Sequence, residues 1–464
     1  MKRIFFSILF PMTLAVATMA QNNGGLSADM LNRIKSSYQE NTSEKALRHA
    51  LAVDDINKLA TNSDNRAYDT YFSHKVLSKG ITNQESSGRC WLFTGLNVMR
   101  SKMINKYHLG TFEFSHNYSF FWDQLEKSNL FLQAVIDYAG KPMDDQFVDW
   151  LFKNPLSDGG QFTGVSDVVT KYGLVPKDVM PETYSSNHTS AMAGLLKQKL
   201  REYGLALREK AAKGMKKESL VKAKEEMLGT IYGMLVRCLG APPAKFTWTM
   251  KDASGKPVGT KEYTPLSFYQ EYVGDDLKGN YVMVMNDPSR PYYRCYEIDM
   301  DRHVYDGENW RYVNLPIDEI KEMAINSIKD STMLYFSCDV GKFLNKEKGF
   351  LDINNYDFVS LMGTTFPMDK KQRIQTFSSS STHAMTLMAV DLDENAKPKK
   401  WMVENSWGAS NGYQGHLIMT DEWFNEYMFR LVVEKKYVPA KVLDILKTKS
   451  TRLPAWDPMF ASEE

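Results

Sequence analysis

The sequence predicts an α+β fold, in which helices dominate the first part of the chain and a sheet follows. Residues 190–239 are rich in Lys, Glu, Ala and Leu, with the apolar residues on one helical face. From residue 279 onward the chain changes to short runs of Val, Tyr, Phe and Met between Gly, Pro, Asn and Asp. Such runs are typical of strands in a buried or half-buried sheet. The order of helices first and strands second indicates the α+β class.

The first twenty residues have the layout of a secretory signal peptide. MKRIFFSILFPMTLAVATMA begins with Lys2 and Arg3, continues with an apolar run and has small residues near Ala17 and Ala20. The run is short for a membrane span and a proline interrupts it, and no other stretch is long enough to cross a bilayer. We therefore expect residues 1–20 to be removed, and the mature protein to be soluble and exported, either periplasmic or secreted.

The rest of the chain divides into five predicted regions. Residues 21–80 are a polar N-terminal arm or cap, with a capped helix that starts near Thr42. Residues 81–189 form a helical lobe, where apolar side chains after Cys90 recur at i, i+4, i+7 and i+11 and predict a helix with one buried face. A mainly helical insertion (190–278), a sheet lobe (279–440) and a C-terminal arm (441–464) follow.

Charge and cysteine usage narrow the classes of partner and cofactor. With 57 Lys+Arg against 56 Asp+Glu the net charge is +1, so no global field attracts nucleic acid or an anionic membrane surface. The 4 cysteines lack close paired spacing, which argues against a disulfide framework. The chain has no CxxC pair and no HExxH motif, which argues against zinc. We expect neither a metal nor another cofactor.

One cysteine occupies a position that suits a nucleophile. A thiol becomes strongly nucleophilic as a thiolate, which a helix N-terminus or an imidazolium favours. Cys90 has the helix N-terminus by position, and the imidazolium must come from a distant part of the chain. The alternative, a small buried hydrophobic residue, is the favoured interpretation for Cys238, Cys295 and Cys338.

His383 is the best candidate for the base among the 8 histidines. It opens a strand-like run, and Asn405 follows 22 residues later, after a turn and a second run. The two side chains can therefore lie on adjacent strands, where the Asn oxygen fixes the imidazole ring. Gln84 offers an amide donor to an oxyanion, beside the backbone N–H of Cys90. A structural hydrogen bond for Gln84 and a turn cap for Asn405 are the alternatives.

Taken in order, these residues resemble the four signatures of papain-like cysteine proteases. The matching segments are Gln84, SSGRCW around Cys90, HA at His383 and NSWG from Asn405. Within that group they are similar to the bleomycin hydrolase and aminopeptidase C branch, as are KYGLVPKDVMPET (171–183) and LPAWDPM (453–459). A papain-type His lies roughly 130–150 residues past its cysteine. Here the separation is about twice that, which indicates a large insertion.

The resemblance implies a two-lobed papain-like fold, with a helical lobe, an antiparallel sheet or barrel lobe, a helical insertion and a C-terminal arm in the active-site cleft. It implies a thiol aminopeptidase of broad specificity that forms an acyl-enzyme on Cys90, with His383 and Asn405 as partners and Gln84 in the oxyanion hole. It also implies peptide substrates and a homohexamer. Gly159 and Gly160 are similar to cleft-lining glycines of the family, although a plain turn is the alternative.

The end of the chain departs from the branch. FASEE (460–464) stands where relatives tend to have a Gly-Ala-Leu-Ala-like end. Either the enzyme trims its own last residues, or the acidic end at Glu464 strengthens the attraction for the ammonium group of a substrate. Two other functions stay open. An endopeptidase with an open cleft would share every catalytic residue, and a nucleic-acid-binding protein would need a local basic patch that the balanced charge does not reveal.

Overall fold

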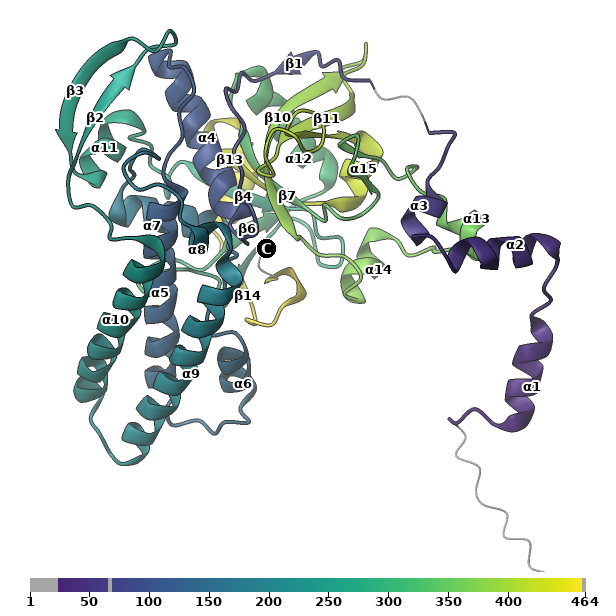
Figure 1. Cartoon of the computed structure of the whole chain (residues 1–464), viewed down its shortest axis with the longest axis horizontal. Coiled ribbons are helices and arrows are strands. Elements are labelled where there is room, and N and C mark those ends of the chain that lie inside the picture. The colour runs from purple at the N-terminus through teal and green to yellow at the C-terminus, as the bar shows by residue number, and fades with distance from the viewer. Residues whose placement is uncertain (1–23, 66–68, 461–464) are drawn as a thin grey trace, which may run out of the picture.

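The structure is a computed structural model that describes residues 24–65 and 69–460 (Figure 1). The predicted signal peptide (1–20) and Glu464 lie outside the described residues. Within the described part of the chain, no helix combines the length and the apolar character needed to cross a membrane. A helical lobe and a sheet lobe lie side by side in Figure 1.

The helical lobe combines long helices with one β-hairpin. Its helices are α4 (Cys90–Tyr107), α5 (His116–Asp137), α6 (Gln146–Lys153), α7 (Phe162–Tyr172), α8 (Tyr184–Asn187), α9 (Thr189–Ala212), α10 (Lys217–Leu239) and α11 (Pro265–Tyr272), and its hairpin strands are β2 (Phe246–Lys251) and β3 (Pro257–Tyr263). The long helices α5, α9 and α10 pack side by side (Figure 1). The apolar residues of α9 that the sequence predicts to face inward, Leu196, Leu200 and Leu207, are buried.

Helix α4 begins at Cys90, as the sequence predicts. The expectation of a single buried face is too narrow, because every residue from 90 to 101 is buried. The helix packs against α5 and α7 and also against strand β10 of the other lobe. The first three turns of α4 are therefore enclosed, and they form part of the junction between the lobes.

The sheet lobe is built on one large sheet. Its strands are β1 (His74–Lys75), β4 (Tyr281–Met285), β5 (Arg294–Ile298), β6 (Arg311–Asn314), β7 (Leu334–Cys338), β8 (Leu344–Asn345), β9 (Phe350–Leu351), β10 (His383–Leu392), β11 (Pro398–Glu404), β12 (His416–Thr420), β13 (Met428–Glu434) and β14 (Thr451–Leu453). They follow the order β14-β5-β6-β4-β13-β7-β10-β11-β12-β9-β8, and β1 pairs with β10. Shorter elements surround the sheet: α12 (Ile317–Lys329), α13 (Phe358–Met362), α14 (Lys370–Gln375), α15 (Asp421–Tyr427), α16 (Ala440–Leu446), η1 (Lys435–Tyr437) and η2 (Pro458–Phe460).

The pairing of the strands is mixed, where an antiparallel sheet was expected. Strands β4, β13, β7, β10, β11 and β12 form a continuous antiparallel series. Parallel pairs occur at β4/β6, β12/β9 and β14/β5. The antiparallel centre is the part that carries the candidate site, because β10 begins at His383 and β11 ends one residue before Asn405.

The two ends of the described chain are held differently. Helices α1 (Ala28–Ser37) and α2 (Thr42–Leu51) contain no buried residue, and α3 (Ile56–Ala60) packs against α13. The predicted start near Thr42 is confirmed, since the Asn41 side chain caps α2 by accepting from the backbone of Glu44. The C-terminal arm instead joins the sheet as β14. The boundaries between the five predicted regions stay a prediction.

Candidate active site

Cys90 is placed by the N-terminus of α4 and is fully buried. The residue before it, Arg89, is the N-cap but makes no side-chain capping bond. The positive end of the helix dipole therefore lies at the thiol, where it favours a negative charge. None of the chain's four cysteines, all of which are described, forms a disulfide.

His383 opens β10, Asn405 directly follows the neighbouring antiparallel strand β11, and their side chains contact each other. The Nε2 atom of His383 is 2.9 Å from Oδ1 of Asn405, so the Nε2–H tautomer donates to the amide oxygen. The ring of Trp407 lies over this pair, 4.9 Å from the imidazole centroid. Both partners are buried, and the orientation of the imidazole is therefore fixed. Because α4 packs against β10, the same junction holds the cysteine and this pair.

Gln84 bridges the segments that carry Cys90 and Asn405. Its Nε2 donates to the carbonyl oxygen of Ser87 (2.7 Å), and its Oε1 accepts from the hydroxyl of Ser406 (2.6 Å). Its backbone N–H also donates to the Ser406 carbonyl oxygen (2.8 Å). The amide nitrogen carries two hydrogens, of which Ser87 takes one. Gln84 therefore makes the structural hydrogen bonds that were the alternative to a catalytic role. One hydrogen of its side-chain amide stays available to donate to an oxyanion.

A buried ion pair joins α4 to the strand that precedes Asn405. The guanidinium of Arg100 contacts the carboxylate of Glu404, and the Ser78 hydroxyl donates to the same carboxylate. Both charged side chains are at most 2% exposed. Burial raises the pKa of Glu404, while Arg100 and Ser78 act in the opposite direction. The pair connects the two lobes at the base of the candidate site.

The loop with Gly159 and Gly160 is fastened to the start of α4. The backbone N–H of Gly88 donates to Oδ2 of Asp158 (2.9 Å), and Nε1 of Trp91 donates to the Asp158 carbonyl oxygen (2.8 Å). On its other side, Nζ of Lys127 donates to the carbonyl oxygen of Gly159 (2.6 Å). The two glycines therefore lie at a fixed distance from the N-terminus of α4.

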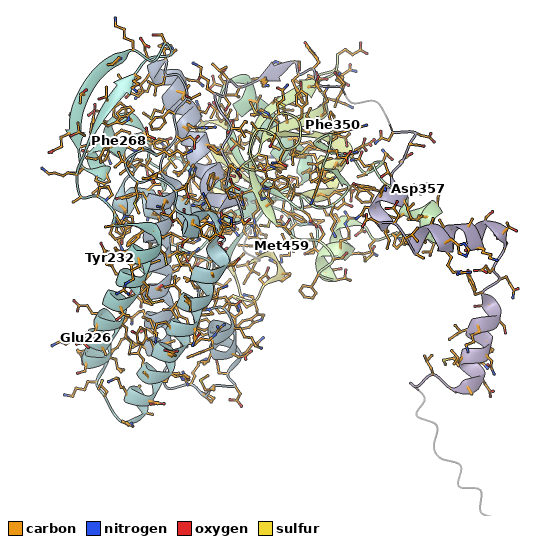
Figure 2. All side chains as sticks on the ribbon, in the orientation of Figure 1. Glu226, Tyr232, Phe268, Phe350, Asp357 and Met459 are labelled. Carbon is orange, nitrogen blue, oxygen red and sulfur yellow. The ribbon has the colours of Figure 1, made fainter. Side chains whose placement is uncertain are left out.

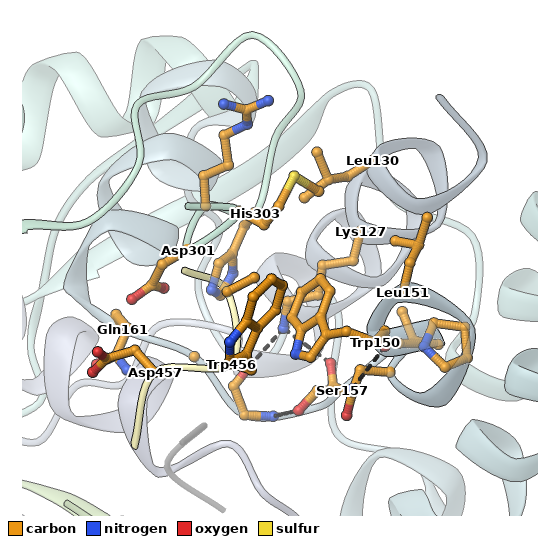
Figure 3. A pocket seen from close by; sticks show the side chains of 18 of the residues that line it. Lys127, Leu130, Trp150, Leu151, Ser157, Gln161, Asp301, His303, Trp456 and Asp457 are labelled. Carbon is orange, nitrogen blue, oxygen red and sulfur yellow. Dashed lines mark hydrogen bonds between the residues drawn. The ribbon is translucent and has the colours of Figure 1, made fainter. Parts of the chain in front are cut away.

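A cavity of about 600 Å³ opens beside this loop. Its wall includes Gly159 and Gly160, parts of α5 and α6, and residues 455–458 of the C-terminal arm. Figure 3 shows Trp150 from α6 and Trp456 from the arm, both of which line this cavity. The arm, the helical lobe and the loops at residues 300–303 and 377–380 thus line this cavity together.

His303 is a residue of this cavity that the sequence did not reveal. Its Nδ1 is 2.5 Å from Oδ1 of Asp123, and its ring meets that of Trp91 edge-on, with the centroids 4.7 Å apart. Burial lowers the pKa of His303, although Asp123 acts in the opposite direction. Lys127 also pairs with Asp123 (3.0 Å). A single histidine in a loop has no pattern around it that would mark it in the sequence. The segment LPAWDPM (453–459), which resembles the branch, could have indicated Trp456.

Adding a methyl group at Gly160 is expected to disturb the site. A Cβ there would lie 2.2 Å from Cε1 of His303 and 2.9 Å from Cδ2 of Trp91. Both rings are buried, so the glycine loop itself must move. We expect Gly160→Ala to lower kcat/KM for a peptide-like substrate by about tenfold or more, because a 1 Å displacement can cost about 10²-fold, and to lower the Tm. Unchanged kinetics and Tm would contradict this packing.

Gly194→Ala is the matched control for that substitution. Gly194 is exposed on α9 and has no atom within 4 Å of an added Cβ. Alanine in an exposed helix is favoured over glycine by roughly 0.5–1 kcal/mol. Its activity should equal that of the parent protein, and its Tm should stay the same or rise slightly.

A buried histidine beneath the cysteine segment makes stability depend on pH. His116 stacks on Phe93 with the ring centroids 3.6 Å apart. Burial, with a smaller effect of the Arg89 charge, lowers the pKa of His116 well below its ordinary value. As the pH falls below about 6.5 the unfolded chain takes up a proton that the folded protein does not. Stability therefore decreases, by up to about 1.4 kcal/mol per pH unit from this group.

Thermal unfolding at pH 7.5 and 5.5 tests this expectation. The variant His116→Phe preserves an aromatic stack and removes the titrating group, so its Tm should fall less between the two pH values than that of the parent protein. His49→Phe, at an exposed position on α2, should behave like the parent. Equal decreases for His116→Phe and the parent would show that His116 does not contribute.

The geometry agrees with what comparison with known proteins shows. The Peptidase C1-like family matches residues 25–460. The chain is 41% identical to the bleomycin hydrolase of Mus musculus over 404 residues, covering 85% of this chain and 89% of that protein. It is 36% identical to the aminopeptidase C of Lactobacillus delbrueckii subsp. lactis over 442 residues, covering 94% and 98% of the two chains.

A solved structure gives the same result. The crystal structure of PepW from Lactobacillus rhamnosis HN001 superimposes with a TM-score of 0.91 at 38% identity, covering 95% of this chain and all of that one. The fold expected from the signatures is therefore confirmed. On the extent of these matches, the chain belongs to the Peptidase C1-like family of cysteine peptidases.

Proposed function

We propose that the protein is a thiol-dependent aminopeptidase that removes N-terminal residues from peptides with broad specificity. The observation that supports it most is the buried His383–Asn405 pair, at the start of β10 and just after β11, in the junction that also holds Cys90 at a helix N-terminus. Relatives named aminopeptidase C and bleomycin hydrolase support the same reaction.

In the proposed mechanism Cys90 is the nucleophile. Its thiolate attacks the carbonyl carbon of the first peptide bond, a C–S bond forms, and the carbonyl oxygen becomes an oxyanion. The backbone N–H of Cys90 and the amide of Gln84 donate to that oxyanion. When the intermediate collapses, the C–N bond breaks, and His383 gives the proton that its imidazole took from the Cys90 thiol to the departing amine. Asn405 keeps the imidazole in the orientation that this transfer needs.

Hydrolysis of the acyl-enzyme completes the cycle. His383 removes a proton from water, the water oxygen attacks the thioester carbonyl, and the C–S bond breaks to release the N-terminal amino acid and regenerate the thiolate. Substrate backbone groups would pair with those of Gly159 and Gly160 on the cavity wall. Residues 455–458 of the C-terminal arm line the cavity, and we propose that the acidic end of the arm, at Glu464, attracts the ammonium group of the substrate and so favours a free N-terminus.

A pair of matched substrates tests the proposal. Hydrolysis of a fluorogenic amino-acid amide is measured beside that of its N-acetylated form, in reducing buffer, with Cys90→Ala as the control. Cleavage of the free-amine substrate alone would support an aminopeptidase. Equal cleavage of both would instead mean an endopeptidase with an open cleft. This alternative shares the whole catalytic set, and it is disfavoured by the position of residues 455–458 in the cavity wall.

Two further parts of the proposal concern assembly and location. By analogy with the branch that the sequence resembles, we propose a homohexamer, which light scattering coupled to size-exclusion chromatography would distinguish from a monomer.

The layout of residues 1–20 supports export. N-terminal sequencing of the mature protein tests this, because an intact Met1 would contradict removal of a signal peptide.

A further inference from the structure

The C-terminal arm is held at three successive points before it ends its described path. It first adds to the sheet, where β14 pairs in parallel with β5 and the N–H of Asp299 donates to the Leu453 carbonyl oxygen (2.9 Å). It then turns at residues 454–457. Beyond that turn two arginines from the sheet lobe hold it, and these two contacts carry the inference.

The first arginine contact is an ion pair between Arg290 and Asp457. The Nη2 atom of Arg290 lies 2.5 Å from Oδ2 of Asp457, and the carboxylate side chain is only 5% exposed. The other oxygen of Asp457 accepts from the backbone N–H of Met459 (3.0 Å). Arg290 is itself fixed by the hydroxyl of Tyr312 (3.1 Å). One carboxylate therefore joins the sheet lobe to the last turn of the arm.

The second arginine contact connects the arm to the cavity wall. Arg430, on β13, is almost fully buried and donates to the backbone carbonyl oxygen of Met459. Its other terminal nitrogen donates to Oε1 of Gln161 (2.7 Å), the residue that follows Gly160. The Met459 side chain is itself fully buried and lies between the two lobes in the view of Figure 2. A single guanidinium thus fixes the end of the arm and the glycine loop relative to each other.

We infer that Arg290 and Arg430 are positioning residues that set the point at which the arm enters the cleft, and that they thereby enforce the choice of substrates with a free N-terminus. The inference rests on the proposed aminopeptidase function and adds the residues that determine it. Neither arginine touches the reacting atoms. They act through Asp457, Met459 and Gln161, which hold the arm as far as Met459 in a fixed position relative to the glycine loop.

A displacement of the arm by a single residue is large enough to matter. An extended residue advances the chain by about 3.3–3.6 Å, which is longer than a hydrogen bond of about 2.7–3.2 Å. A shift of the arm by one residue would therefore break a hydrogen bond between the arm and a substrate. Charge-assisted bonds from the guanidinium groups of Arg290 and Arg430 resist such a shift.

Asp457→Asn is the first test. Asparagine is similar in size and its oxygen can still accept from the Met459 N–H, so the substitution weakens the Arg290 contact with little change in packing. The readout is the ratio of kcat/KM for the free-amine amide to that for its N-acetylated form. We expect this ratio to fall at least fivefold, through a higher KM for the free-amine substrate and faster cleavage of the acetylated one.

Asp421→Asn is the matched control. Asp421 pairs with Lys321 at 2.6 Å and accepts from Trp401, in a partly buried ion pair that is not part of the cavity wall. For Asp421→Asn, the ratio of kcat/KM for the free-amine amide to that for the N-acetylated form should stay within about twofold of the parent value. If Asp457→Asn lowers both rates equally and leaves the ratio unchanged, the contact is only structural and the inference is wrong.

A glycine inserted between Met459 and Phe460 is the second test. It leaves both arginine contacts in place and displaces only the residues after Met459, so the ratio should again fall while the Tm stays near that of the parent protein. An unchanged ratio would show that the position of the arm after Met459 does not determine selectivity, which would overturn the inference. If the intact protein cleaves both substrates equally, the proposed aminopeptidase function fails, and this inference fails with it. A preference in the intact protein that both variants retain overturns the inference alone.

Discussion

Replacing Cys90 with alanine is expected to remove peptidase activity almost completely while leaving the fold intact. The substitution deletes one sulfur atom from a buried position at the start of α4, and alanine is a good residue for a helix. The chemical step, however, loses its nucleophile, and neither His383 nor Gln84 can replace it. For comparable nucleophiles that act as a unit with their base, kcat falls by about 10⁴–10⁶-fold.

The measurement is turnover of the free-amine amide under reducing conditions, together with the Tm. Cys238→Ala is the control, because Cys238 lies on α10, far along the chain from the candidate site, and is only partly buried. It should retain the parent rate. An alkylating reagent should inactivate the parent protein and Cys238→Ala alike. Residual activity of Cys90→Ala within tenfold of the parent would disprove the assignment of the nucleophile.

The second large effect is expected at the Arg100–Glu404 pair. Truncating one member of a buried ion pair leaves an uncompensated charge and typically costs about 3–5 kcal/mol, a large fraction of the stability of most proteins. We expect Glu404→Leu to lower the Tm strongly. It should also reduce activity, because Glu404 directly precedes Asn405 and its loss loosens the strand that positions the amide.

The double variant Arg100→Met/Glu404→Leu separates the effect of the unpaired charge on stability from the effect of altered packing. Removing both charges replaces the pair with apolar side chains, which is often close to neutral for stability, so the double variant should be more stable than Glu404→Leu alone. Asp149→Asn, in the exposed Lys153–Asp149 pair on α6, should leave the Tm nearly unchanged. A double variant no more stable than Glu404→Leu would show that the buried charge is not the cause of the loss.

The parts of the molecule that the sequence predicted are those that depend on local pattern. The start of α4 at Cys90 and the strands that carry His383 and Asn405 follow from periodicity and turn residues, because neighbours in the chain determine them. The parallel pairing of β14 with β5 and the burial of α4 on nearly all sides depend on which distant segments meet. No local pattern contains that information.

The residues of the candidate site likewise divide into those that a local pattern marks and those that only the fold brings together. Gln84, Cys90, His383 and Asn405 are predicted from the sequence, because the residues around each of them suit a candidate chemical role. His303 and Arg430 are not, since a histidine in a loop and an arginine within a strand have no distinctive surroundings in the sequence. Their partners, Asp123 and Gln161, are far from them along the chain. Only folding brings these polar groups together at the cavity.

The arm is a sheet edge as well as a wall of the cleft, and this constrains protein engineering. A truncated variant intended to cleave internal bonds should end at Met459. A truncation that begins before Thr451 should be avoided. Removing β14 would leave β5 as an unprotected edge, which can pair with another copy of the chain and aggregate. It would also empty the space that Met459 fills in the helical core. Ending the chain at Met459 keeps both the pairing of β14 with β5 and the residues of the arm that line the cavity.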